Sequence, residues 1–203
     1  MCTESSPPID LSGNVSEFFK GLVAEAIQRQ AYEPTEAAES YVVALLTDFA
    51  KPGQLNEETL NRPVTLLLHE ALESSGHERF EKLRVLGDGV LYVSGFFGDH
   101  LEIRGIEPEY VSTVGARAYA GASTMLVPTR AGRQSDVFAE LAQKFSLFVG
   151  LVRDIAEKLY ARGNSHRATV ELYERWLRTG STSLAQELST RGVLPVRGSG
   201  VLH

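Results

Sequence analysis

The sequence predicts an all-α fold, a single compact bundle of about seven or eight helices, and two observations carry this prediction. Apolar residues recur at helical spacing through most of the chain from Asn14 to Gly192, whereas the alternation typical of strands is scarce. Capping residues, prolines and glycines separate these segments at helix-length intervals. We therefore expect a helical domain over residues 14–192, a flexible leader over 1–13 and a flexible tail over 193–203.

Each expected helix has its own start or stop signal. Asn14 and Glu17 resemble a capping box at the start of the first helix, and Ser183 to Gln186 resemble another at the start of the last. The longest apolar stripe runs from Phe138 to Leu159 and predicts one long helix that forms the centre of the core. The expected helices cover about residues 15–30, 34–50, 64–76, 78–98, 108–126, 135–159, 166–179 and 183–192.

The segment between Phe80 and Leu126 contains two apolar stretches that are rich in small residues. Glycine inside a helix costs about 1 kcal/mol relative to alanine, so repeated glycines indicate that a neighbouring helix or a ligand approaches the backbone closely. The sequence leaves both possibilities open. The small residues are Gly87, Gly89, Ser94, Gly95 and Gly98 in the first stretch and Gly115, Ala116, Ala118, Ala120, Gly121 and Ala122 in the second.

Polar residues beside these glycines define a candidate ligand site. A buried aspartate needs a partner, and Arg84, Arg104 or Arg117 is available to Asp88 or Asp99. The simpler interpretation is an ion pair or cap that fixes the bend between helices. The alternative is a small-molecule pocket between residues 78–98 and 108–126. The candidate ligand-binding residues are Asp88, Tyr92, Phe96, Asp99, His100, Tyr110 and Tyr119.

Motifs for metal or nucleotide chemistry are incomplete. His69 and Glu70 begin like a zinc-protease motif, but Glu73 stands where the second histidine ligand is required. The glycines at 87 and 89 do not follow a strand, which disfavours a nucleotide-binding loop. We expect no catalytic residue, no metal site and no cofactor. A metal-assisted hydrolase that uses Glu70, Glu73, Asp99 and His100 is the least favoured alternative.

Composition and charge exclude several classes of protein. A formal charge of −6 argues against nonspecific nucleic-acid binding, and the single cysteine, Cys2, excludes an internal disulfide framework. The longest apolar runs are far shorter than the roughly 20 residues of a membrane span. The first residues lack the pattern of a secretory signal. We expect a soluble, cytoplasmic protein.

Three side chains are candidates for an interface with another protein. Leu66 projects opposite the apolar face of its helix, which favours a contact with a partner. Tyr173 and Trp176 lie beside arginines, an arrangement that nucleic-acid binding proteins use for stacking. At helical spacing these two aromatic residues are more often core and rim, and we favour packing.

Four segments resemble a family of small, uncharacterised bacterial proteins. They are LGDGVLYVSGFF (86–97), YVSTVGARAY (110–119), VFAELAQKFSLFVGLV (137–152) and ELYERWLRTGS (171–181). The resemblance covers most of residues 15–192. It implies an all-helical bacterial protein and transfers no activity, ligand or catalytic residue. The sequence thus favours a non-enzymatic protein that binds a partner protein or another copy of itself.

Overall fold

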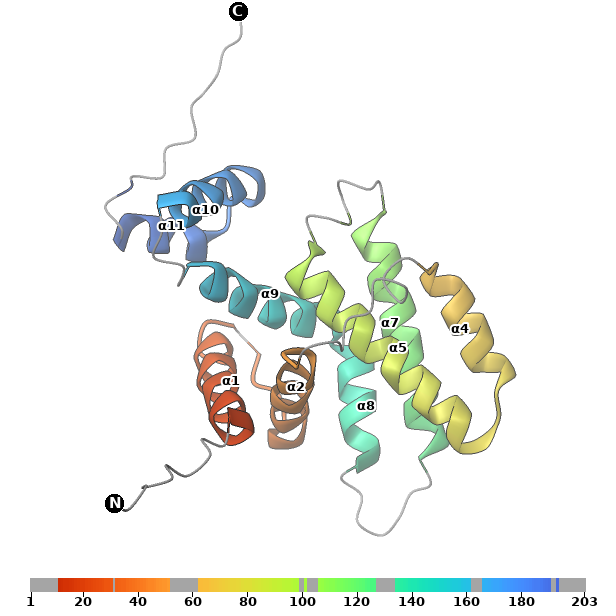
Figure 1. Ribbon diagram of the computed structural model, residues 1–203. Coiled ribbons are helices and arrows are strands. Elements are labelled where there is room, and N and C mark those ends of the chain that lie inside the picture. Colours follow the sequence, from red (N-terminus) through yellow and green to blue (C-terminus); the bar gives the residue numbers. More distant parts are fainter. Residues whose placement is uncertain are drawn as a thin grey trace, which may run out of the picture. The chain divides into compact units, whose positions relative to one another are not determined.

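The described part of the chain is entirely helical or irregular, which confirms the all-α prediction. The computed structural model describes residues 11–30, 32–51, 62–98, 101, 106–126, 134–161, 166–190 and 193, and these form nine helices and no strand (Figure 1). The helices are α1 (Leu11–Ile27), α2 (Glu36–Phe49), α4 (Val64–Glu73), α5 (Gly76–Phe96), α7 (Pro108–Met125), α8 (Gln134–Gln143), α9 (Phe145–Ala161), α10 (His166–Thr179) and α11 (Thr182–Thr190).

These helices belong to two compact units, Met1–Val152 and Arg153–His203, where the sequence indicated one helical domain over 14–192. The first unit holds α1 to α8 and the first half of α9. The second unit holds the rest of α9 together with α10 and α11. It has a small core of its own, made by Leu172, Trp176, Leu184 and Leu188.

The first unit is built around the contact between α5 and α7. Helix α7 also packs against α8, and α4 lies against both α5 and α7 (Figure 1). Helices α1 and α2 pack against each other, and α2 reaches α8 and α5. The α1–α2 pair buries an apolar face because its apolar residues recur at helical spacing. The fully buried members of this face include Val23, Ala26, Ala38 and Leu46.

Three expected helix boundaries differ from those observed. Helix α1 begins at Leu11, so Asn14 lies inside the helix and is not its cap. Helix α2 begins after Thr35, whose side chain accepts a hydrogen bond from Ala38 N at 3.2 Å. Helix α11 is capped by Ser181, whose Oγ accepts a bond from Leu184 N at 3.4 Å, and Ser183 already lies within the helix. Helix α1 thus begins about one turn earlier than expected and α11 one residue earlier, whereas α2 begins two residues later, after the Thr35 cap.

The prediction of a single long helix over 135–159 is wrong, because the helix is interrupted at Lys144 and divided into α8 and α9. Figure 1 shows the chain changing direction there. Leu147 N and Phe148 N both donate to Lys144 O, at 2.9 and 3.1 Å, so α9 starts a new turn from this carbonyl. No glycine or proline marks the break, and the apolar spacing continues across it. The packing of Phe145, the first residue of α9, against α7 accompanies the change of direction.

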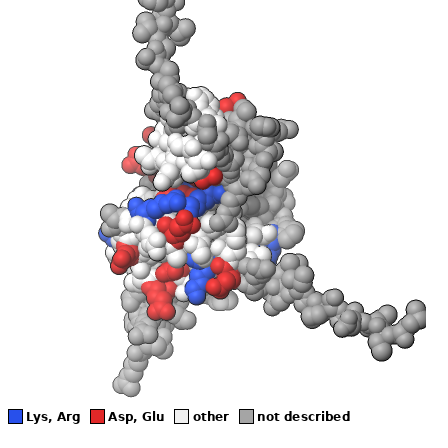
Figure 2. All heavy atoms as spheres, turned by 90° about the vertical axis from the view of Figure 1, so that its left-hand side faces the viewer, with Lys and Arg blue, Asp and Glu red and all other residues white. Residues whose placement is uncertain are grey.

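The surface carries both signs of charge. On the face that Figure 2 displays, the described Lys and Arg side chains lie among described Asp and Glu side chains. The structure also has no helix, within its described residues, with the length and apolar character needed to span a membrane.

Candidate functional site

Gly87 of α5 and Gly115 of α7 make room for side chains of neighbouring helices. A Cβ atom added at Gly87 would lie 2.6 Å from both Cδ1 and Cε1 of Tyr119 on α7. One added at Gly115 would meet the ring of Phe145 and would lie 2.7 Å from Cγ1 of Val90 on α5. These distances are far inside van der Waals contact. At Gly87 and Gly115, the close approach that the sequence indicated is therefore one between helices and not one to a ligand.

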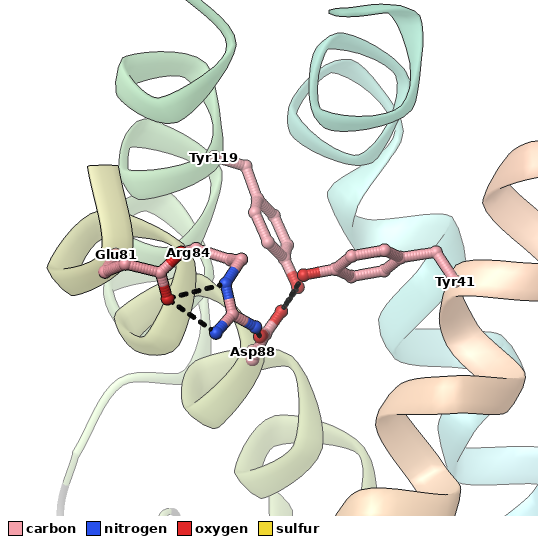
Figure 3. A network of polar contacts seen from close by, with 5 residues as sticks. All are labelled: Tyr41, Glu81, Arg84, Asp88 and Tyr119. Carbon is pink, nitrogen blue, oxygen red and sulfur yellow. Dashed lines mark hydrogen bonds and ion pairs between the residues drawn. The ribbon is translucent and has the colours of Figure 1, made fainter. Parts of the chain in front are cut away.

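Asp88 lies beside this contact and joins three helices through hydrogen bonds (Figure 3). Its Oδ1 accepts bonds from the hydroxyls of Tyr41 on α2, at 2.7 Å, and Tyr119 on α7, at 2.8 Å. Its Oδ2 accepts a bond from Arg84 Nη1 at 3.0 Å, one turn earlier on α5. Arg84 also donates to Glu81 Oε2 through Nε, at 3.3 Å, and Nη2, at 2.8 Å. We call these five residues the Asp88 cluster.

Burial controls the protonation of the Asp88 cluster. Asp88 is 8% exposed, and burial raises the pKa of its carboxyl, a rise that the hydrogen bonds from Tyr41 and Tyr119 oppose only in part. Burial also raises the pKa of the Tyr119 hydroxyl well above its ordinary value, and the nearby Asp88 carboxylate raises it further. The pKa of Tyr41 is raised for the same two reasons. Both phenols therefore stay protonated and donate to Asp88 at neutral pH.

The chemistry of the Asp88 cluster is that of a satisfied buried ion pair. Both carboxylate oxygens accept bonds from groups of the same chain, and Arg84 balances the charge, as a buried carboxylate requires. The sequence predicted Arg84 as a possible partner of Asp88. It did not predict Tyr41, because the position of this tyrosine on the apolar face of α2 indicated only packing. A buried tyrosine usually needs a partner for its hydroxyl, and this rule would have singled it out.

The other predicted ligand-binding residues do not join this cluster. Tyr92 stacks on Phe49, with ring centroids 4.4 Å apart, and on Phe96, at 4.5 Å. These three rings are partly buried at the ends of α2 and α5. Tyr110 is 47% exposed at the start of α7. Asp99 and His100 lie outside the described residues.

A second carboxylate cluster, which the sequence did not reveal, links α8 to the start of α2. Glu140 Oε1 accepts bonds from the Tyr32 hydroxyl and, at 3.0 Å, from Thr35 N, while Oε2 accepts one from Thr35 Oγ1 at 2.5 Å. Burial raises the pKa of Glu140, but the bonds from Thr35 and Tyr32 outweigh this effect and hold the pKa below its ordinary value. Burial and the bond to Glu140 raise the pKa of Tyr32 to about 12. We call these three residues the Glu140 cluster.

The residues of the incomplete metal motif lie on the exposed side of α4. Glu70 pairs with Arg62, and His69 Nδ1 lies 3.4 Å from Glu73 Oε2. Within the described residues, no three side chains of metal-binding type come close enough to hold an ion together. The residues of the motif are therefore engaged in surface contacts with neighbouring side chains.

The predicted interface residues fall into two groups. Leu66 is 47% exposed on α4, as its place on the helix indicated. Trp176 is 7% exposed in the core of the second unit, and Tyr173 packs against it with ring centroids 5.5 Å apart. In the same unit, the buried Glu157 accepts bonds from the hydroxyls of Ser181, at 2.6 Å, and Ser183. Trp176, Tyr173 and Glu157 thus pack within the second unit.

Comparisons with known proteins identify no relative. No family model, no curated protein and no solved structure matches this chain.

Proposed function

We propose that this is a non-enzymatic helical protein that acts by associating with a second copy of itself through α4. The observation that carries the proposal is the exposure of Leu66 and Leu72, each 47%, on a helix of only ten residues. Ala71 is the one residue of α4 that is fully buried, although the helix also carries Val64, Leu67 and Leu68. Helix α4 thus has more apolar surface than its contacts with α5 and α7 cover.

The charges around Leu66 favour a second copy over a partner of opposite charge. Arg62 and Glu70 form an ion pair on this face, and His69 Nδ1 lies 3.4 Å from the carboxylate of Glu73. In a twofold dimer the same surface meets itself, so a face with one sign of charge repels its copy. A face with both signs can pair its acids with the bases of the other copy.

The interior of the first unit supports a binding protein better than an enzyme. In the Asp88 cluster each oxygen of the carboxylate accepts a bond from a side chain of the chain itself. A general acid or base has to reach a substrate, and Asp88 is held among Tyr41, Tyr119 and Arg84. Its arrangement suits the stabilisation of three helices.

One observation favours the alternative function, the binding of a small molecule near the end of α5. Ser94 is 3% exposed, and its Oγ makes no hydrogen bond to any described residue. It lies beside Gly95 and two residues from both Tyr92 and Phe96 in the sequence. A ligand with a hydrogen-bonding group would satisfy the hydroxyl. A thermal shift on addition of a metabolite library, present in the wild type and lost in Ser94→Ala, would support this alternative.

The self-association proposal is tested by sedimentation velocity of the wild type and two variants. Leu66→Glu places a charge at the centre of the exposed face of α4 and should shift the protein to monomer. Leu177→Glu makes the same change at a leucine of similar exposure, 43%, on α10, and should leave the association unchanged. Equal sedimentation of the wild type and both variants, all as monomers, would contradict the proposal. Association of Leu66→Glu equal to that of the wild type would also contradict it, because the interface would then lie elsewhere.

A further inference from the structure

The α1–α2 pair is attached to the rest of the first unit at two polar points. Tyr32 and Thr35, which lie between the two helices and at the start of α2, bind Glu140 of α8. One turn and a half further on, Tyr41 of α2 binds Asp88 of α5. Each point has the same construction, because a tyrosine hydroxyl of the pair donates to a carboxylate of the remaining helices.

Aromatic contacts surround both points. The ring of Tyr41 lies edge-on to Phe138 of α8, with centroids 5.3 Å apart, and the ring of Tyr32 lies edge-on to Phe148 of α9, at 6.2 Å. Phe138 and Phe148 are 7% and 2% exposed. Separation of the α1–α2 pair would therefore uncover an aromatic surface on α8 and α9.

We infer that the α1–α2 pair is a separately releasable element of the first unit, held in place by the Asp88 and Glu140 clusters. Proteins open in cooperative parts, and a part fixed by a few specific bonds at its edge can open below the energy of global unfolding. Apolar packing between α2 and α8 keeps the pair closed. The two clusters make its release depend on protons.

The proton dependence follows from the groups that face each carboxylate. Glu140 faces Tyr32 and Thr35, and Lys144 Nζ lies 5.7 Å from the centre of the Tyr32 ring. Because the folded-state pKa of Glu140 lies below its ordinary value of 4.5, its stabilising effect is present above that pH and is lost as the pH falls. Acid therefore weakens the attachment of the α1–α2 pair at Glu140.

The Asp88 cluster responds in the opposite sense. Asp88 faces Tyr41 of α2, Tyr119 of α7, and Arg84 and Glu81 of its own helix, while α8 contributes the uncharged Phe138. The raised folded-state pKa of Asp88 means that its stabilising effect is present in acid and is lost as the pH rises. Glu140 is thus the group whose protonation releases the pair.

Hydrogen exchange measured by mass spectrometry tests the inference on the full chain. Tyr32→Phe and Tyr41→Phe each remove one bond to a charged group, so exchange in α1 and α2 should rise about tenfold or more, with α5 and α7 unchanged. Tyr110→Phe is the control, because it removes a hydroxyl from a tyrosine that is 47% exposed. After correction for intrinsic rates, the wild type should be compared with Glu140→Gln, which leaves Asp88 unchanged, and relative to this variant it should open progressively more readily as the pH falls below 4.5.

Two outcomes would overturn the inference. In the first, α1, α2, α5 and α7 exchange together in every variant, so that the first unit opens as one body. In the second, Tyr32→Phe and Tyr41→Phe exchange like Tyr110→Phe, so that the two bonds do not hold the pair. Neither outcome depends on whether the protein forms a dimer through α4, which Leu66→Glu tests by itself.

Discussion

Gly87 of α5 leaves room for the ring of Tyr119 on α7, and a side chain at position 87 would lie 2.6 Å from two of its carbons. The same ring carries its hydroxyl to Asp88, the next residue of α5, at 2.8 Å. One tyrosine therefore fills the space above a glycine and satisfies the neighbouring carboxylate. This relationship explains why a small residue and a buried acid follow each other in an apolar helix.

The first prediction compares two glycines of α5 that differ only in their surroundings. Gly87→Ala should lower the free energy of unfolding by about 1–3 kcal/mol, because the new methyl group overpacks the contact with Tyr119. Gly89→Ala should raise it by about 1 kcal/mol through helix propensity, since an added Cβ there meets nothing within 4 Å. Urea denaturation of the two variants and the wild type measures both changes.

The glycine pair also tests whether the space between α5 and α7 is filled. If Gly87→Ala stabilised the protein as much as Gly89→Ala, the ring of Tyr119 would not occupy this position. A hollow contact of that kind would favour the small-molecule pocket.

The second prediction concerns the pH dependence of Asp88. Burial raises the folded-state pKa of Asp88 above its ordinary value of 3.8, so ionisation of the carboxyl destabilises the folded state as the pH rises from about 4 to neutrality. Asp88→Asn removes this ionisation. Its free energy of unfolding, relative to the wild type, should therefore increase over that range.

An exposed carboxylate provides the control for Asp88. Asp48 pairs with Lys51 at 2.7 Å on the surface, and its side chain is 65% exposed. Asp48→Asn removes one negative charge from the surface and therefore controls for the change in net charge over the same denaturation series. A difference between Asp88→Asn and wild type that stayed constant, or that fell with rising pH, would refute our description of the Asp88 cluster.

The third prediction concerns the tyrosine hydroxyls. Tyr32, Tyr41 and Tyr119 have raised pKa values, so in the folded protein three of the seven tyrosines should remain protonated at about pH 11. Their stabilising effect is complete below pH 10.0, the ordinary value, and is lost as the pH rises above it. A near-ultraviolet absorbance titration should thus show a late phase that coincides with alkaline unfolding. Tyr41→Phe should reduce that phase by about one third, and a single early phase would contradict the prediction.

The sequence predicts the helices well because each is encoded locally. Pro108 and the spacing of apolar residues predict the bounds of α4, α5 and α7 to within two or three residues, although α4 ends at Glu73 and Gly76, expected to end it, begins α5. The break at Lys144 could not be predicted, since the apolar stripe continues across it. It is accompanied by the packing of Phe145 against Gly115, a contact between residues 30 positions apart.

The candidate site was predictable only in part for the same reason. A buried aspartate at position 88 follows from an acidic residue in an apolar helix, and Arg84 follows from its position one turn away. The hydroxyls of Tyr41 and Tyr119 come from other helices, and sequence spacing carries no information on which helices meet. The sequence pattern did not single out Glu140, because this residue occupies an ordinary polar position on an amphipathic helix. Only the fold brings Tyr32 and Thr35 to it.

Self-association is the central claim of this account, and the molar mass of the wild-type chain in solution tests it most directly. Light scattering coupled to size-exclusion chromatography, run over a series of protein concentrations, gives this mass without a label or a variant. The account predicts twice the chain mass of 22.2 kDa at the higher concentrations, with a shift toward the monomer on dilution. A mass of 22.2 kDa at every concentration would contradict it.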